Sequence, residues 1–214
     1  MLTIAIASQK GGAGKTTLCL HLSVLAAERG PTLAIDLDPQ GSLSFWHSRR
    51  QAPTPLLITG TADKLPVYIQ AAKQEGIRFC LVDLPPHDSA ATAAAMRVAD
   101  IVLIPARPSA LDLHAVSSTL DMVRTLKKRA AVVLSQCPAK RGFGDPQAVT
   151  DARKVIVDLG GSVCPVSITA RVVAAQSVIA GQAVTEMEPD GAAAREFSSL
   201  WQWIEGTAEN DKAA

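Results

Sequence analysis

Residues 8–18, "SQKGGAGKTTL", follow directly on the apolar run "LTIAIA" at 2–7. A glycine-rich loop between a strand and an apolar helix is typical of a phosphate-binding loop. The usual pattern is Gly, four residues, then Gly-Lys-Ser/Thr, which would place a glycine at position 9, where the chain has Gln9. The loop also carries a second lysine, Lys10, beside the expected Lys15. The stretch therefore predicts phosphate binding by an altered form of the loop.

Apolar, β-branched runs alternate with helical patterns along the rest of the chain. The predicted strands lie at 2–7, 32–36, 56–59, 79–83, 101–105, 131–135 and 162–168. The predicted helices lie at 15–29, 63–75, 88–98, 109–128, 145–159 and 190–205. Continuous apolar strands separated by helices indicate a parallel sheet that is covered on both faces. The predicted fold class is α/β: a doubly wound, mostly parallel sheet with helices on both faces, as in P-loop NTPases.

Length and composition exclude several classes of protein. A chain of 214 residues fits a single P-loop domain at 1–206 with a flexible polar tail at 207–214. Hydrophobic residues make up 48% and charged residues 19%, which argues against disorder. A net charge of +1 gives no general attraction to nucleic acid, so DNA binding would need a local basic patch. The scattered cysteines are expected to be small buried hydrophobes in a reducing cytosol.

We expect no membrane association. The sequence has no apolar run of about 18 residues and no basic segment at its N-terminus that would indicate a signal peptide. The last residues, "EGTAENDKAA", do not form the amphipathic pattern of a membrane-surface helix. The predicted localisation is cytoplasmic.

Three polar clusters follow predicted strands: "SQKGGAGKTT" at 8–17, "DLDPQGS" at 36–42 and "DLPPHDS" at 83–89. In parallel α/β sheets, ligands bind at the carboxyl ends of the strands. The backbone of the first loop is expected to hold an anion with its N–H groups through Gly11, Gly12, Ala13 and Gly14. Lys15 can reach the β- and γ-phosphates, Thr16 can bind Mg²⁺, and Thr17 can reach the α-phosphate.

The other two clusters supply carboxylates. Asp83 closes an apolar strand, where a second ligand for Mg²⁺ is expected, often acting through water. Asp36 and Asp38 are two residues apart, so on a strand their side chains would point the same way. We assign Asp36 to the metal shell and Asp38, which lies further out, to positioning the attacking water.

The motifs together resemble the ParA-type partition ATPases, in the deviant-Walker-A group of the ParA/MinD family. The resemblance rests on "KGGAGKTT" (10–17), "DLDPQGSLSFW" (36–46), "VDLPP" (82–86), "IPARPSALDL" (104–113) and the segment at 168–197. It runs from about residue 2 to 205, and the late segment looks most like the short plasmid type exemplified by ParF.

The resemblance implies a role for Lys10. In this family the matching lysine crosses to the nucleotide of a second subunit, much as an arginine finger does, and this ties hydrolysis to dimerisation. The implied partners are a second copy of the chain when ATP is bound, a ParB- or ParG-like centromere-binding activator, and non-specific DNA. The implied cofactors are ATP, ADP and Mg²⁺, and the implied location is the nucleoid.

Other assignments depend on the resemblance alone. Family members often have Asn where this chain has Ser135, and the adenine is expected near that strand end and near Pro165. DNA contacts are expected first at Arg171, in the late segment, and at Lys140 and Arg141.

Several functions remain open from the sequence. The switch could segregate a plasmid or chromosome, or it could position a protein cargo such as a chemotaxis cluster or a microcompartment. A metabolic ATP-dependent ligase or synthase on the same scaffold is a further alternative, although short loops leave little room for its substrate pocket.

Overall fold

The computed structural model describes residues 1–140 and 144–210. It forms a six-stranded parallel sheet in the order β3-β2-β4-β1-β5-β6. The strands are β1 (Leu2–Ile6), β2 (Thr32–Asp36), β3 (Leu56–Thr59), β4 (Phe79–Asp83), β5 (Ile101–Ala106) and β6 (Ala130–Leu134). The predicted α/β class is confirmed, because the four inner strands are apolar and buried on both faces as a parallel sheet requires.

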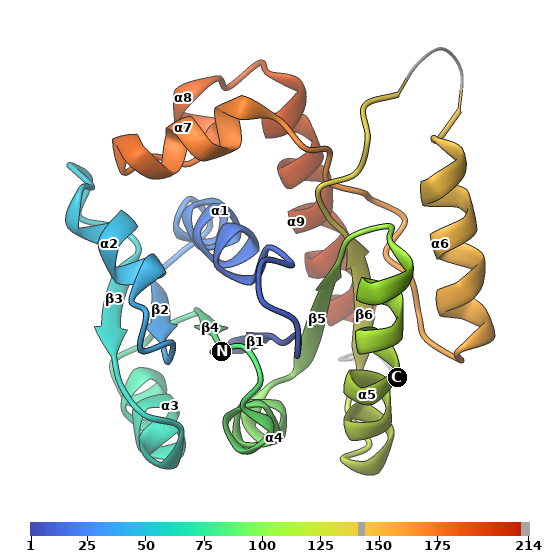
Figure 1. Cartoon of the computed structure of the whole chain (residues 1–214). Helices are drawn as coiled ribbons and strands as arrows, with labels where there is room; N and C mark the ends of the chain where they lie inside the picture. The colour runs from blue at the N-terminus through green and yellow to red at the C-terminus, as the bar shows by residue number, and fades with distance from the viewer. Residues whose placement is uncertain (141–143, 211–214) are drawn as a thin grey trace.

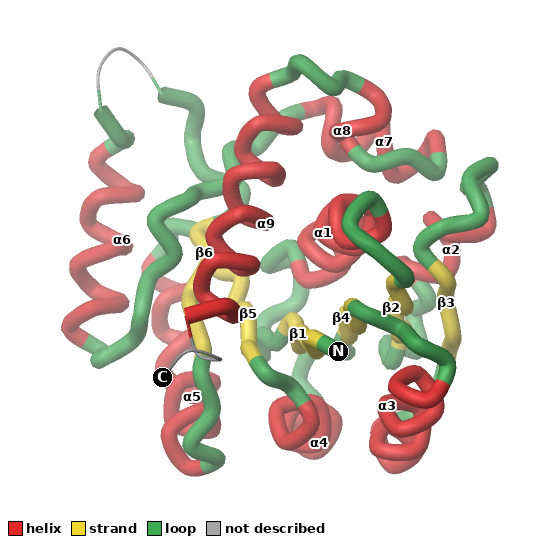
Figure 2. Tube along the Cα trace, turned by 180° about the vertical axis from the view of Figure 1, so that it is seen from behind, coloured by secondary structure: helices red, strands yellow, loops and turns green. Residues whose placement is uncertain are grey.

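Helices cover both faces of the sheet (Figure 1). On one face lie α1 (Lys15–Ala27), α2 (Ser42–Ser48), α7 (Val172–Ala180), α8 (Val184–Met187) and α9 (Ala192–Asn210). On the other lie α3 (Leu65–Gln74), preceded by the 3₁₀ turn η1 (Ala62–Lys64), α4 (Ser89–Val98), α5 (Ala110–Thr125) and α6 (Gln147–Asp158). Figure 2 shows the same two layers from behind.

The two cores follow from alternation along the strands. Ala5 and Ile35 point to the α3–α6 face, whereas Ile4, Ile6 and Ala34 point to the α1–α9 face. The chain moves from β1 to one side of the sheet through α1 and later returns to β1's other neighbour, β5. This change of direction places the loop after β1 at the switch point, where open α/β sheets bind ligands.

The predicted seventh strand at 162–168 is wrong as a continuous strand. The segment runs parallel to β6, but it makes only isolated bridges within the part of the chain that is described. The N–H of Cys164 bonds to the carbonyl of Val132, and the N–H of Ile168 bonds to that of Leu134. Four residues of the segment therefore span two residues of β6. Pro165 stands in this bulge and has no N–H to donate to the ladder.

The helices differ from prediction at a few places. The sequence analysis missed three short helices, α2, α7 and α8. Helix α9 continues to Asn210, so the polar tail does not begin at residue 207. Its apolar side packs against the sheet, where the Trp201 and Phe79 rings meet edge-on with centroids 5.3 Å apart. No described helix is long and apolar enough to cross a bilayer.

All four cysteines, as predicted, are buried and free. Burial raises the pKa of Cys80 to about 12 and those of Cys137 and Cys164 to about 11. The thiols are therefore protonated near neutral pH and act as packing groups.

Candidate functional site

The loop between β1 and α1 borders a cavity of about 420 Å³. Gly12 and Gly14 have φ angles of 72° and 97°, in the left-handed region where glycine is favoured. The positive end of α1 opens here, so the cavity is suited to an anion. The lining residues are Gly11, Gly12, Gly14, Lys15, Thr16, Thr17, Leu20, Asp38, Gln40, Ser42, Pro86, Gln136 and Val178.

Two residues that follow β6 brace this loop. The Ser135 hydroxyl donates to the Ala13 carbonyl at 2.7 Å, and the Gln136 amide donates to the Gly12 carbonyl at 2.7 Å. The sequence analysis noted Ser135 as a departure from the family and missed Gln136. The signal that could have found both is a polar pair directly after a buried strand, which is the criterion that found the other clusters.

Lys15 lies almost fully buried at the base of the cavity, with its ammonium donating to the Lys10 carbonyl at 3.2 Å. Burial lowers the pKa of Lys15, and the negative charges of Asp83 and Asp38 oppose that effect. An ammonium beside the N-terminus of α1 is suited to bind phosphate oxygens.

Asp83 and Thr16 form the site that best fits Mg²⁺. The Thr16 hydroxyl donates to Asp83 Oδ2 at 2.7 Å, while Asp83 Oδ1 is buried without a hydrogen-bond partner among the described residues. Burial raises the pKa of Asp83 to about 7, against the lowering effect of the Thr16 hydrogen bond. A buried carboxylate with an open coordination position, beside a hydroxyl, is a donor set that a hard cation prefers. The residues present therefore fit the predicted metal.

Asp36 lies beside Asp83 on the neighbouring strand, but its oxygens are already engaged. Its Oδ1 accepts from the Asp38 N–H at 3.1 Å. Its Oδ2 accepts from the Ser44 N–H at 2.9 Å and from the Ser44 hydroxyl at 2.6 Å. These contacts fix the turn at residues 37–44 and favour a positioning role for Asp36. Its predicted place in the metal shell stays a prediction.

Asp38 lines the cavity, and its Oδ1 accepts from the Gln40 N–H at 2.9 Å. The argument that Asp36 and Asp38 point the same way does not apply, because β2 ends at Asp36 and Asp38 lies in the following turn. Asp38 nevertheless lines the same cavity as Lys15 and Thr16. This position is compatible with its predicted role in positioning the attacking water.

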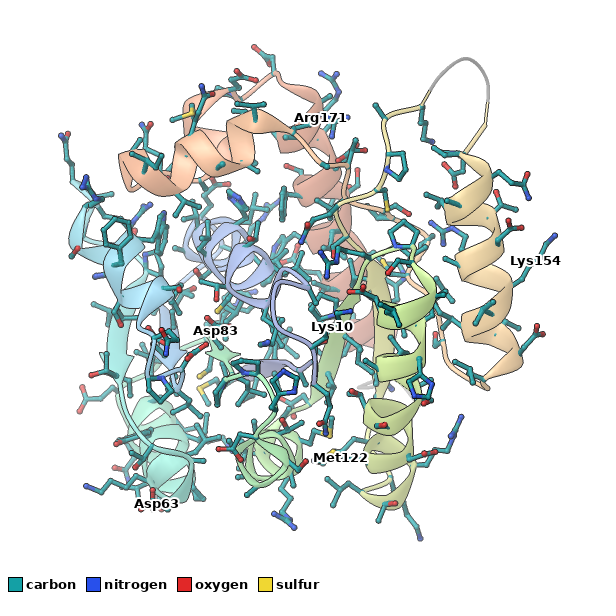
Figure 3. The ribbon with its side chains drawn as sticks, in the orientation of Figure 1. Lys10, Asp63, Asp83, Met122, Lys154 and Arg171 are labelled. Atoms are coloured by element: carbon teal, nitrogen blue, oxygen red, sulfur yellow. The ribbon has the colours of Figure 1, made fainter. Side chains whose placement is uncertain are left out.

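Lys10 is in the loop before α1 and lies beside the start of α5 (Figure 3). Its ammonium is 3.4 Å from Asp112 Oδ2. Asp112 also accepts from Arg107 Nε at 3.0 Å and from the Ser109 hydroxyl at 2.6 Å. Burial alone would raise the pKa of Asp112, but the Ser109 and Arg107 hydrogen bonds and the charges of Arg107 and Lys10 together lower it.

The structure places Pro165 in a different cavity, of about 400 Å³, whose other lining residues include Lys140, Arg153 and Glu196. The Pro165 carbonyl accepts from Arg153 at 2.9 Å. The cavity at the phosphate loop is lined instead by residues that include Gln136, Leu20 and Val178. Pro165 therefore does not line the cavity at the phosphate loop.

The candidate DNA residues are paired with acids. Arg171 lies 2.6 Å from Glu196 Oε2, and Lys140 lies 2.8 Å from Asp145 Oδ1. Figure 3 shows Arg171 beside the upper end of the molecule, away from Lys10. Arg141 lies outside the described residues. DNA binding by these residues stays a prediction.

Comparison with known proteins places this geometry in a family. Residues 4–141, more than half of the chain, match the family model described as the CobQ/CobB/MinD/ParA nucleotide binding domain. The maintenance of carboxysome distribution protein A of Halothiobacillus neapolitanus is 34% identical over 203 residues, 90% of each chain. Protein ParA of Rhizobium radiobacter is 32% identical over 126 residues, which are 58% of this chain and 56% of that protein.

A solved structure of nucleotide-free McdA from Cyanothece superposes with a TM-score of 0.76 at 22% identity, covering 95% of this chain and 99% of that one. That likeness concerns the fold, whereas the family model and the Halothiobacillus relative match the sequence over most of the site. The resemblance drawn from the phosphate loop is confirmed. This chain belongs to the CobQ/CobB/MinD/ParA family of nucleotide-binding domains, and within it to the ParA/MinD type.

Proposed function

We propose that this protein is an ATP-driven positioning switch. ATP and Mg²⁺ bind at the loop after β1, two subunits close over the nucleotides, the dimer binds non-specific DNA, and partner-stimulated hydrolysis releases it. The family is one of P-loop ATPases, which supports the enzymatic step. The observation that carries the proposal is the meeting of Lys15, the Thr16–Asp83 pair and Asp38 around one cavity. The Lys10 carbonyl accepts a hydrogen bond from the Lys15 ammonium beside it.

The residues divide the work of hydrolysis. Backbone N–H groups of the loop and the Lys15 ammonium hold the phosphates, and Asp38 orients the water that attacks the γ-phosphorus. The bond to the β–γ bridging oxygen breaks, giving ADP and inorganic phosphate. Thr16 and Asp83 would hold Mg²⁺, which neutralises charge on the β- and γ-phosphate oxygens. Asp36 acts indirectly by fixing the turn that carries Asp38.

Lys10 links this chemistry to assembly. Its ammonium contacts Asp112 of its own chain, whereas Lys15 lines the cavity. We infer that Lys10 completes the site of a second copy of the chain. A cation added in trans stabilises charge in the transition state by roughly 10³–10⁵ in rate in related phosphoryl transfers.

The cargo we propose first is a protein assembly of the microcompartment class. The sequence leaves DNA and protein cargoes open, and the Halothiobacillus relative, whose name refers to carboxysome distribution, matches 90% of this chain. The activator would then be an adaptor protein on the cargo surface. The working location would be the nucleoid within the cytoplasm.

Segregation of plasmid or chromosomal DNA is the second candidate. The resemblance to ParA-type proteins and the similarity to Protein ParA of Rhizobium radiobacter favour it. In that case the activator would be a ParB- or ParG-like centromere-binding protein.

The switch is tested by measuring size and DNA binding of the purified protein with ATP, with ADP and without nucleotide. We expect a dimer that binds non-specific DNA with ATP only, persistence of that dimer in Asp38→Ala, and no hydrolysis in Lys10→Ala. DNA affinity should fall with salt along a slope that counts the phosphates contacted. A monomer that ignores DNA in every nucleotide state would contradict the proposal and favour a metabolic ATP-dependent synthase.

The cargo is tested by deleting the gene in its own host. Clustered microcompartments with normal plasmid retention would support the first candidate. Plasmid loss with evenly spaced microcompartments would support the second.

A further inference from the structure

The contact between Lys10 and Asp112 has a consequence for the switch. A lysine that must reach the nucleotide of a second subunit needs a place to lie when that subunit is absent. In this structure its ammonium is 3.4 Å from a carboxylate whose side chain is 3% exposed. A charge pair of this kind, partly shielded from water, holds more strongly than an exposed surface pair.

The surroundings of Asp112 suit a reversible contact. If Lys10 left, Arg107 Nε at 3.0 Å and the Ser109 hydroxyl at 2.6 Å would still bind the Asp112 carboxylate. A buried charge that loses its partner normally destabilises a protein strongly, because nothing compensates it. Here a second cation and a hydroxyl remain, so Lys10 can detach without leaving that carboxylate uncompensated.

The Lys10–Asp112 contact also joins two separate elements of the structure. Ser109 is the N-cap of α5 and accepts from the Asp112 N–H, so Asp112 belongs to the first turn of that helix. Lys10 arrives from the loop between β1 and α1, about one hundred residues earlier in the chain. The pair therefore joins the phosphate loop to the start of α5, and its state can change without unfolding either element.

We propose that Asp112 is a positioning residue that stores Lys10 within its own subunit, with Arg107 competing for the same carboxylate, and that this storage sets the threshold for ATP-dependent dimerisation. The inference rests on the proposed function for its consequence, but the storage itself concerns a single subunit. Removing the acid should release Lys10 and lower the threshold. Removing Arg107 should leave Lys10 as the sole cation on the carboxylate and raise the threshold. Opposite effects of two neighbouring substitutions would not arise from general loosening of α5.

The first experiment measures storage directly in the nucleotide-free protein. Lysines are acetylated under limiting reagent, and the modification rate of Lys10 is read by mass spectrometry relative to Lys154, which lies on α6 (Figure 3). We expect Lys10 to react about three- to tenfold faster in Asp112→Asn and at least about twofold slower in Arg107→Ala, as for loss or gain of one charge-assisted contact. The matched control is Asp121→Asn, an acid on the same helix that pairs with Arg124.

Equal Lys10 rates in Asp112→Asn and Asp121→Asn would overturn the proposal. The ratio to Lys154 guards against misfolding, because an unfolded variant would raise the reactivity of both lysines together. If Asp112→Asn does not fold, Arg107→Ala decides alone: an unchanged or faster Lys10 rate in that variant rejects storage.

The second experiment tests the consequence. Dimer formation with ATP is followed by sedimentation in an Asp38→Ala background, with each of the three substitutions added. The half-saturating protein concentration should fall about three- to tenfold with Asp112→Asn and rise with Arg107→Ala, while Asp121→Asn leaves it unchanged. If the protein dimerises with ATP and its half-saturating concentration is the same in all three variants, the storage role is rejected and the proposed function is unaffected. If no variant dimerises with ATP, the proposed function fails, and the acetylation ratios still decide whether Asp112 holds Lys10.

Discussion

The phosphate edge and the late segment of the chain handle their charges in opposite ways. At the phosphate edge, formed by residues 8–17, 36–44 and 83–88, Asp83 keeps one buried oxygen without a hydrogen-bond partner among the described residues, and Lys15 is buried against a carbonyl. In the late segment, residues 168–197, Arg171 pairs with Glu196. There Glu186 also accepts two hydrogen bonds from Arg50, which follows α2 in the chain.

This difference teaches how to separate a site from a scaffold. A buried carboxylate oxygen without a partner destabilises the protein, so its presence beside an anion-binding loop points to a ligand that completes it. A charge that is fully paired within the chain needs no ligand and contributes to positioning. We therefore assign the candidate catalytic site to the phosphate edge. The late segment is the structural frame that holds α2, α7, α8 and α9 together.

The largest expected effect concerns Lys10. Lys10→Ala should lower the rate of ATP hydrolysis by roughly 10³-fold or more if it acts in trans as a cationic finger. Nucleotide binding should be retained, because Lys15 and the loop backbone still hold the phosphates. Steady-state phosphate release and fluorescent-nucleotide binding measure the two quantities. The matched substitution in the late segment, Arg171→Ala, should leave basal hydrolysis within about twofold. Equal losses in both variants would erase the contrast between the two regions.

Asp83 should make the metal-free protein less stable as pH rises. Its pKa is about 7 in the folded state because of burial, above the usual value near 4, so the folded state binds the extra proton between these values. The free energy of unfolding should therefore fall from about pH 4 to 7 and stay low above it, by up to roughly 4 kcal/mol.

Asp83→Asn can still accept from Thr16, and it should remove this pH dependence and raise the melting temperature at pH 8. Calorimetry across pH 5–8 checks it, and the variant should also lose any stabilisation by Mg²⁺ added with ADP. If the free energy of unfolding rose from pH 5 to 8 in the wild type and this rise disappeared in Asp83→Asn, the assignment of a raised pKa to Asp83 would be contradicted.

Arg50 tests the frame. Its side chain is 2% exposed, donates to Glu186 and to the Gly181 carbonyl, and lies over the Trp46 ring. Arg50→Ala should lower the free energy of unfolding by about 3 kcal/mol, because Glu186 and a carbonyl lose their partner together. Its neighbour Arg49, placed over the Phe45 ring, is the matched control and should cost under about 1 kcal/mol on truncation. Urea unfolding of both variants measures the difference, which should exceed experimental scatter.

The smallest expected effect concerns Arg171. The pair with Glu196 is partly exposed, so Arg171→Ala should change stability by about 1 kcal/mol or less. If DNA phosphates displace Glu196, the same variant should weaken binding of the ATP dimer to DNA a few-fold and reduce the salt slope by about one. Binding titrations at several salt concentrations check this. An unchanged salt slope would indicate that Arg171 does not contact DNA and has only a structural role.

The phosphate edge was largely predictable from the sequence. Gly12, Gly14, Lys15 and Thr16 are close in the chain, and Asp83 ends a strand whose apolar pattern fixes its position in a parallel sheet. Such features depend on local spacing and on strand order, which hydrophobic periodicity reports.

The late segment and the residues just before it were less predictable. Pro165 interrupts the pairing of residues 162–168 with β6, although the apolar pattern alone favours a strand. Helix α7 is apolar along most of its length, so periodicity gave no boundary for it. Short helices such as α8 depend on tertiary contacts, here the bond from the Val184 N–H to the buried His21 ring, rather than on propensity.

The family, the parallel sheet, the anion-binding loop and the carboxylate at the end of β4 could all be inferred from spacing along the chain. Which polar groups are satisfied depends on the folded structure. It turned Asp36 toward Ser44, brought Ser135 and Gln136 onto the loop, and placed Lys10 against Asp112. The contacts of Ser135, Gln136 and Lys10 join residues far apart in sequence, and they depend on how the helices and loops pack across the sheet, which no local pattern encodes.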